Sequence, residues 1–434
     1  MVTARERSPH EGEALARSAR LPHASDMHSP CPRWLGLLLA LALRTDAPAA
    51  PAAFPAIYIA NHFENASPLW WEVGDAGEIH LHLVYDHERD SPNRAAGHWH
   101  FQVQAPTGAN LRLVLHNLDN VWNGRSGSPV SDRTISFTSP DGREWTPVET
   151  AHLPGNLLEI ELRMPGPSLF IARLEPYRLS DLAAFQEEIR AHRDVGFETI
   201  GHTVMGRPLQ MLRVGDPGAP HRVLIRTRAH AWEPGGDWVV EGLVRRLLAD
   251  DADARRWRRE YSVHVLSMAN ADGVARGLTR FNALGKDLNR NWDRPADPAL
   301  APENHALEQW IERLMQAGRK PDLAIDFHND EGGRLHVSRP ETGGERYLAN
   351  LDRFERLLRR HTWFTEGSTG ASFRNPGTMG EGLLARYGID ACIHELNANW
   401  IAGLDSFPSA RNWQLYGAQL AVVFSEYFAS HGVE

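Results

Sequence analysis

The chain has 434 residues, of which 42% are hydrophobic and 23% are charged, with 46 Lys and Arg against 55 Asp and Glu. The net charge of −9 argues against a dedicated nucleic-acid-binding protein, because binding to phosphates requires a basic surface. Cys31 and Cys392 are the only cysteines, which excludes a disulfide framework and a cysteine-rich zinc site. The length and apolar content are those of a globular protein with two or three domains.

Residues 1–53 are predicted to be a leader that contains a signal peptide. An apolar run at 35–43 follows an arginine and precedes several small residues, which is the pattern of a secretory signal. The run is shorter than the ~20 residues that a membrane-spanning helix needs, so we expect no stable membrane insertion after its removal. We therefore expect a secreted or periplasmic protein; if the run is only an incidental stretch in a disordered leader, the protein is cytoplasmic. Translation from Met27 instead of Met1 would give a signal of more usual length.

Residues 54–176 are predicted to form an antiparallel β-sandwich. Apolar residues alternate with polar ones, as in Ile79, Leu81 and Leu83, and this alternation is typical of strands with one buried face. Turn-forming segments such as SPNRAAG and SPDGRE separate the runs at the short spacing of a sandwich. We assign the tryptophans of this region to the sandwich core rather than to a sugar-binding surface, although two adjacent ones cannot both point inward: Trp70, Trp71, Trp99 and Trp122.

Residues 177–434 change to alternating strands and helices. Strands are predicted over 223–226, 261–267, 323–327 and 391–396, and helices over 238–248, 303–315, 347–359 and 412–428, with a further helix that Ser180 caps. This alternation predicts an α/β domain with a mixed sheet and helices on both faces. No flexible linker separates it from the sandwich, so we expect the two domains to pack together.

Four polar segments of this second domain could carry chemistry. HAWE places His230 three residues before Glu233, a spacing at which both can bind one metal ion. A loop rich in Arg and Asn runs from ANADG to KDLNRNW, and DFHND places His328 at the end of an apolar strand. HEL places Glu395 inside another apolar strand, where a carboxylate is usually paired, metal-bound or catalytic. Taken singly, each segment is also compatible with a structural role.

Together, and in this order, the four segments resemble the zinc metallocarboxypeptidases of the funnelin type. They are closest to the cytosolic-carboxypeptidase-like branch and its bacterial relatives. HAWE matches the family's His-x-x-Glu motif, and ANADG matches Asn-Pro-Asp-Gly with Ala271 in place of proline. KDLNRNW, DFH and HEL match the remaining motifs. The resemblance extends from Phe54 to the C terminus, and it implies a carboxypeptidase-like catalytic domain over 177–434, preceded by a β-sandwich.

The resemblance implies a hydrolase that binds one zinc ion per chain and releases C-terminal residues from peptides or proteins by attack of metal-activated water. The residues it assigns are the zinc ligands His230, Glu233 and His328; Asp287, which would orient His230; Glu395 as general base; Arg280 as oxyanion stabiliser; and Asn289 and Arg290, which would bind the substrate's terminal carboxylate.

One residue of the family pattern is missing. The family usually has a tyrosine about twenty residues before the catalytic glutamate, where it covers the substrate's last residue. Here no tyrosine lies between Tyr347 and Tyr387, and Tyr387 is too close to Glu395 to match. The segment 372–378 takes that place, and its Arg374 is predicted to face the pocket for the terminal side chain and to favour acidic residues. The alternative is that Arg374 is exposed or pairs with Glu381.

Two other functions are compatible with the same residues. An amidohydrolase of this fold would act on N-acyl amino acids or cell-wall peptides, and a non-catalytic binding protein would keep the fold without turnover. His394 is expected to point away from Glu395, because neighbouring side chains of a strand alternate between its faces. Cys392 is expected to be a buried structural residue. The sequence does not indicate the oligomeric state.

Overall fold

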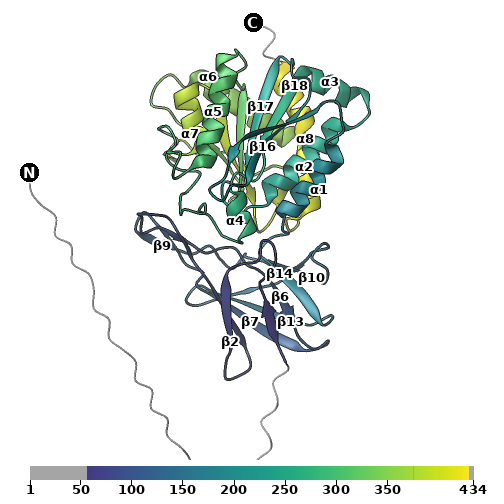
Figure 1. Ribbon diagram of the computed structural model, residues 1–434, viewed down its shortest axis with the longest axis vertical. Coiled ribbons are helices and arrows are strands. Elements are labelled where there is room, and N and C mark those ends of the chain that lie inside the picture. The colour runs from purple at the N-terminus through teal and green to yellow at the C-terminus, as the bar shows by residue number, and fades with distance from the viewer. Residues whose placement is uncertain (1–55, 375, 430–434) are drawn as a thin grey trace, which may run out of the picture. The chain divides into compact units, whose positions relative to one another are not determined.

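The computed structural model describes residues 56–374 and 376–429. The predicted signal at 35–43 and Cys31 lie outside these residues. Within them, no helix has the length and apolar character needed to cross a membrane. Two halves follow each other along the chain, an all-β region and an α/β region (Figure 1).

The first half is the predicted β-sandwich. One five-stranded sheet has the order β1 (Tyr58–Ala60), β6 (His100–Gln104), β14 (Ser168–Ala172), β10 (Ser136–Ser139) and β11 (Thr146–Val148). The other has the order β12 (Ala151–Leu153), β13 (Leu157–Arg163), β7 (Asn110–His116), β3 (Ile79–Leu83) and β2 (Leu69–Val73). Alternate residues of both sheets, among them Leu81, Phe101 and Ile160, are fully buried between them, which explains the period of two in the sequence.

Pairing in these two sheets is antiparallel as predicted, with one exception. Strands β3 and β7 run parallel, with Ile79 opposite Leu113. Between them the chain crosses to the other sheet to form β6, and such a crossover returns the chain in the same direction.

A small third sheet was not predicted. It consists of β4 (Asp86–His87), β5 (Arg94–Ala95), β8 (Asn120–Trp122) and β9 (Arg125–Gly127). Its presence corrects the assignment of the tryptophans: Trp99 lies in the sandwich core, whereas Trp122 belongs to this sheet and contacts the α/β half. Trp70 is 52% exposed and stacks on His82 instead of entering the core.

The second half contains one mixed seven-stranded sheet. Its order is β15 (Val195–His202), β16 (Pro208–Val214), β18 (Tyr261–Leu266), β17 (His221–Thr227), β19 (Leu323–Asp330), β21 (Asp390–Asn397) and β20 (Leu335–Val337). The four central strands β18, β17, β19 and β21 are parallel, and the remaining pairings are antiparallel. Nearly all residues of the central strands are buried, as expected for strands that are covered on both faces.

Helices cover both faces of this sheet, which confirms the predicted α/β class (Figure 1). One face packs against α1 (Leu179–Ile189), α2 (Gly235–Leu248), α3 (Ala252–Glu260), α6 (Glu345–His361) and α8 (Ala410–Ala429). The other packs against α5 (Pro302–Gln316) and α7 (Met379–Tyr387), and a short helix α4 (Ala271–Ala275) follows β18. The predicted cap of α1 was wrong by two residues: Arg178 is the N-cap, and its backbone N–H donates to Asp181.

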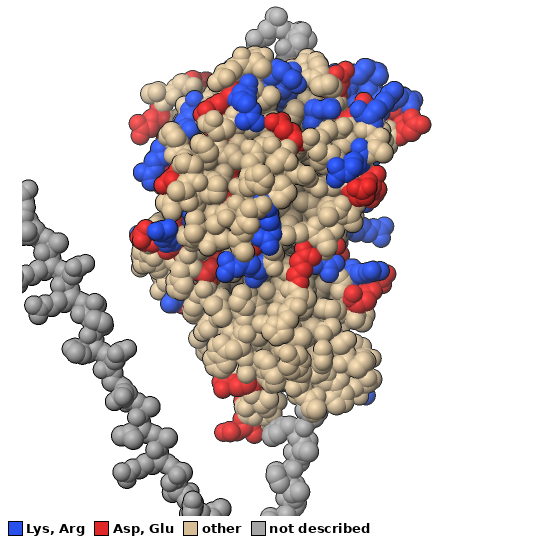
Figure 2. Space-filling model, in the orientation of Figure 1, with Lys and Arg blue, Asp and Glu red and all other residues tan. Residues whose placement is uncertain are grey.

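Charged side chains are distributed unequally between the halves. On the face shown in Figure 2, Lys, Arg, Asp and Glu lie mainly over the α/β half, while the sandwich shows few of them. Acidic and basic groups are interspersed there, and no single-sign patch indicates a polyanionic partner.

Candidate active site

The candidate residues meet at the carboxyl ends of the parallel strands, where open α/β sheets bind their ligands. The loop after β17 carries His230, the end of β19 carries His328, and β21 carries Glu395. His328 and Glu395 lie opposite each other in the register of β19 and β21, so neighbouring strands present them side by side.

The loop after β17 is held in an unusual conformation. Arg228 has a left-handed backbone with φ of 55°, which is uncommon for a non-glycine residue. Its buried guanidinium lies 3.2 Å from the Asp237 carboxylate and donates to the carbonyl oxygen of Tyr177 at 2.6 Å. These contacts hold the turn that directs His230 and Glu233 back toward β19.

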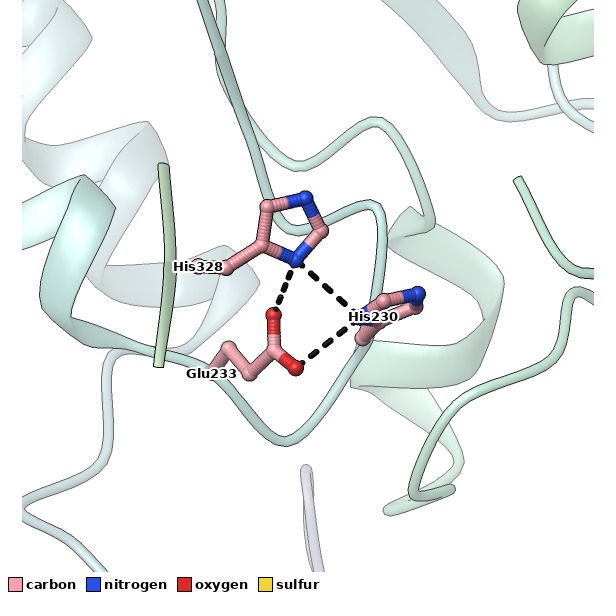
Figure 3. A group of neighbouring side chains, drawn as sticks. All are labelled: His230, Glu233 and His328. Atoms are coloured by element: carbon pink, nitrogen blue, oxygen red, sulfur yellow. Dashed lines mark hydrogen bonds and ion pairs between the residues drawn. The ribbon is translucent and has the colours of Figure 1, made fainter. Parts of the chain in front are cut away.

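His230, Glu233 and His328 form a buried cluster (Figure 3). The Glu233 oxygens lie 2.9 Å from His230 Nδ1 and 2.7 Å from His328 Nδ1, and the two Nδ1 atoms are 3.1 Å apart. Burial by itself would raise the pKa of Glu233, but the two imidazoles outweigh it and lower that pKa to about 2. Two nitrogens and a carboxylate converging at this spacing fit the His₂Glu set of catalytic zinc sites.

A carboxylate orients the second nitrogen of each histidine. His230 Nε2 lies 3.2 Å from Asp287 Oδ1, the contact that the sequence predicted. His328 Nε2 lies 2.8 Å from Asp326 Oδ2, and Asp326 in turn accepts from Arg226 Nε at 2.8 Å. The sequence interpretation missed the role of Asp326. The signal that could have revealed it is the spacing: Asp326 precedes His328 by two residues on β19, so both side chains lie on the same side of the strand. Such partners fix the tautomer and ring orientation of a metal-binding histidine.

Glu395 lies beside this cluster, close to a second carboxylate, that of Asp330. One of its carboxylate oxygens is buried without a hydrogen-bond partner among the described residues. Asp330 and His336 lie close enough for ligand atoms of all three residues to fall within 4.8 Å of one another. Burial and the neighbouring charge of Asp330 raise the pKa of Glu395 well above its usual value. A raised pKa is typical of a carboxylate that exchanges protons during a reaction.

Arg280 approaches the cluster from the loop that follows α4. Its Nε donates to Asp287 Oδ2 at 2.8 Å, and its NH1 lies 3.4 Å from His230 Nδ1. The ANADG motif supports this loop, because Asn270 Nδ2 donates to the carbonyl oxygens of Arg280 and Phe281 at 3.2 and 3.0 Å. A guanidinium held at this position is suited to stabilise a developing negative charge.

Asn289 and Arg290 are near the cluster but differ in availability. The Asn289 amide is buried, with Nδ2 3.3 Å from His328 Nε2 and Oδ1 accepting from the backbone N–H of Met379 at 2.9 Å. Arg290 is partly exposed and borders a cavity of about 380 Å³ that Glu88 and Lys286 also line. Of the two, Arg290 is better placed to bind a substrate carboxylate.

The segment 372–378, which the sequence predicts in the place of the family's tyrosine, borders a pocket close to Glu395. A small pocket between β20, β21 and α7 is lined by His336, Phe373, Arg374, Glu381 and Ile393, among others. Arg374 is exposed at this pocket, and its NH1 donates to the carbonyl oxygens of Ala371 and Phe373. The hydroxyl of Tyr387 donates to Glu312 on α5 at 3.1 Å and so is not a substitute for the missing tyrosine.

His394 and Cys392, which precede Glu395 on β21, behave as predicted. His394 points to the opposite side of β21, where its Nε2 lies 2.6 Å from the Tyr416 hydroxyl, and burial lowers the pKa of His394 to about 3. Cys392 is buried, and burial raises its pKa. Neither side chain faces the candidate site.

Known proteins are similar in sequence to parts of this chain. Residues 184–331 match the family model of zinc carboxypeptidases. An uncharacterized protein of Zymomonas mobilis is 25% identical over 66% of this chain and 70% of its own length. Human cytosolic carboxypeptidase 4 is 34% identical over 25% of this chain, but the match spans only 10% of that protein.

Solved structures agree in fold. A metallo-carboxypeptidase from Burkholderia cenocepacia superposes with a TM-score of 0.75 at 22% identity, covering 87% of this chain and all of that one. A metallo-carboxypeptidase from Pseudomonas aeruginosa, solved with (2-guanidinoethylmercapto)succinic acid, gives a TM-score of 0.69 at 22% identity and covers 85% of this chain and all of its own. The predicted family is confirmed for the α/β half: residues 184–331 form a domain of the zinc carboxypeptidases, a family of peptide hydrolases, and the chain is homologous to the cytosolic carboxypeptidases.

Proposed function

We propose that the protein is a zinc-dependent carboxypeptidase that removes residues from the free C terminus of peptides or proteins. The observation that carries this proposal is the buried His230–Glu233–His328 cluster with the Glu395 carboxylate beside it. A cluster of metal ligands next to a carboxylate with a raised pKa combines a Lewis acid site with a proton acceptor.

Each nearby side chain has a separate role in this proposal. Zinc held by the cluster would polarise the scissile carbonyl and lower the pKa of water. Glu395 accepts a proton from the attacking water and later donates it to the leaving amine. Arg280 donates to the carbonyl oxygen as it becomes negative, and Arg290, with Asn289, binds the terminal carboxylate of the substrate.

The test combines zinc analysis with a peptide panel. Purified protein should contain about one zinc ion per chain and should release single residues from peptides with free C termini but not from amidated ones. Glu395→Gln should keep the zinc and lose about 10²- to 10⁴-fold in kcat, the range for loss of a general acid–base group. Glu161→Gln, the same change at an exposed site of β13, should remain fully active. Folded protein without zinc affinity would contradict the proposal.

We also propose a preference for acidic C-terminal residues. The pocket beside Glu395 is bordered by Arg339 and Arg374, and the single carboxylate among its lining residues, Glu381, accepts a hydrogen bond from the backbone N–H of Gly377. Arg374 would have to rotate away from its own loop to reach a substrate carboxylate. Equal turnover of peptides ending in Glu and in Lys would contradict this preference.

The substrate panel also distinguishes a carboxypeptidase from an amidohydrolase of the same fold. Hydrolysis of N-acyl amino acids or cell-wall peptides, with no turnover of ordinary peptides, would identify an amidohydrolase of this fold. Export remains a prediction from the run at 35–43, and N-terminal sequencing of the mature protein tests it.

A further inference from the structure

The side chain of Arg280 is held by a residue from the other half of the chain. The guanidinium carbon lies 4.4 Å from the ring centroid of Trp122, which covers one face of this planar group. At the edge of the group, Nε donates to Asp287, while NH1 points toward His230 at 3.4 Å. The stacked ring and the carboxylate together restrict the torsions of a long, otherwise mobile side chain.

The backbone of Arg280 is held from the same side. Asp86 of β4 accepts hydrogen bonds from the backbone N–H groups of Arg280 and Phe281 at 2.7 and 2.8 Å. A second link joins the backbone N–H of Arg89 to the carbonyl oxygen of Gly285 at 2.6 Å. Strand β4 and the connection from β4 to β5 therefore contact the chain at Arg280 and again five residues later, at Gly285.

Trp122 is itself fixed in place. Its strand β8 pairs with β5 and β9, and the neighbouring Asn120 accepts a hydrogen bond from the backbone N–H of Ala96 at 2.8 Å. The ring of Phe281 meets the ring of Trp122 edge-on at 6.0 Å. Trp122 thus packs between its own sheet and the loop it contacts.

We propose that Trp122 is a positioning residue for Arg280, through which the β-sandwich half takes part in the reaction of the α/β half. The inference rests on the proposed function, because it assigns Arg280 to the oxyanion. Removing the ring frees the guanidinium to leave its position beside His230. Since oxyanion contacts strengthen only as the reaction proceeds, the loss should appear in kcat more than in KM.

The kinetic test uses a small set of variants of the full chain. Trp122→Leu should lower kcat by about 3- to 30-fold, the range expected for a cation–π contact, and Trp122→Phe should recover most of it. In an Arg280→Ala background, Trp122→Leu should cause no further loss. Trp70→Leu, the same change at an exposed site of the sandwich, should have no effect.

A chemical test does not depend on activity. Phenylglyoxal modifies arginine, and mass spectrometry of peptides gives the modification rate of Arg280 itself. This rate should rise in Trp122→Leu and stay at the wild-type value in Trp70→Leu, with unchanged zinc content and unfolding temperature. If wild-type protein cleaves no peptide, the proposed function fails while the modification rates still decide the role of Trp122.

Two results would overturn the inference. One is an unchanged kcat and an unchanged Arg280 modification rate in folded, zinc-loaded Trp122→Leu. The other is an equal loss of kcat in the wild-type and Arg280→Ala backgrounds, which would mean that Trp122 acts independently of Arg280. If the leucine variant does not fold, Trp122→Phe replaces it, with a smaller rise in modification rate expected.

Discussion

Replacing Asp326 by asparagine should weaken zinc binding without changing any ligand. Asp326 is 1% exposed and lies between His328, the zinc ligand of the proposed function, at 2.8 Å, and the guanidinium of Arg226, which is fully buried. Asparagine keeps the size of the side chain but removes its charge. The His328 ring then loses the partner that fixes its tautomer and raises its basicity.

Two separate losses follow from this geometry. Loss of the partner of a metal-bound histidine lowers zinc affinity by about 10- to 100-fold. Loss of one member of a buried ion pair lowers the free energy of unfolding by about 3 kcal/mol, because Arg226 remains charged and buried. Its other contacts are with the carbonyl oxygen of Leu288 at 3.0 Å, with Asn304 at 3.3 Å and with the ring of Trp292, and none of these carries a compensating charge.

The two losses can be measured independently. Competition with a chelator gives the zinc affinity, and urea unfolding of zinc-free protein gives the stability without the contribution of bound metal. Asp390→Asn is the matched control, because Asp390 is also buried and lies 3.3 Å from an arginine, Arg346, but far from the cluster along β21. It should lower stability and leave zinc affinity unchanged. Zinc affinity of Asp326→Asn within twofold of wild type would refute the reasoning.

Three further outcomes are expected. Burial and nearby arginines lower the pKa of His264 to about 3. Below pH 6.5 the unfolded state therefore binds more protons than the folded state, and the free energy of unfolding should fall by about 1.4 kcal/mol for each pH unit of acidification. Urea unfolding between pH 7 and 5 should show a smaller loss in His264→Gln, but not in His202→Gln, whose histidine is exposed. A Cβ added at Gly417 would lie 1.8 Å from a backbone oxygen of α2, so Gly417→Ala should lower the unfolding free energy by about 3 kcal/mol, whereas Gly166→Ala, in open space, should be neutral. Arg374→Ala should reduce the ratio of kcat/KM for peptides ending in Glu over Lys by roughly two- to fivefold; an unchanged ratio would exclude contact with the substrate.

Local patterns in the sequence were sufficient for most of the fold. The closing helix was predicted over 412–428 and spans 410–429, because amphipathic periodicity is a property of adjacent residues. Helix α7 was missed, since Gly380 and Gly382 lower its helix propensity. At Gly382, a Cβ would lie 2.3 Å from the backbone oxygen of Trp292, so packing against a distant segment requires glycine there.

The sequence by itself determined the family, the cluster of His230, Glu233 and His328, and the place of Glu395, because motif spacing and chain order record these features. Only the tertiary structure decided what surrounds them. Arg226 and Asp326 pair across neighbouring strands although they are 100 residues apart in the chain, and Asp326 also contacts His328. Trp122 reaches Arg280 from the other half of the molecule. Such contacts depend on how strands and domains pack, and packing between distant segments leaves no regular spacing in the sequence.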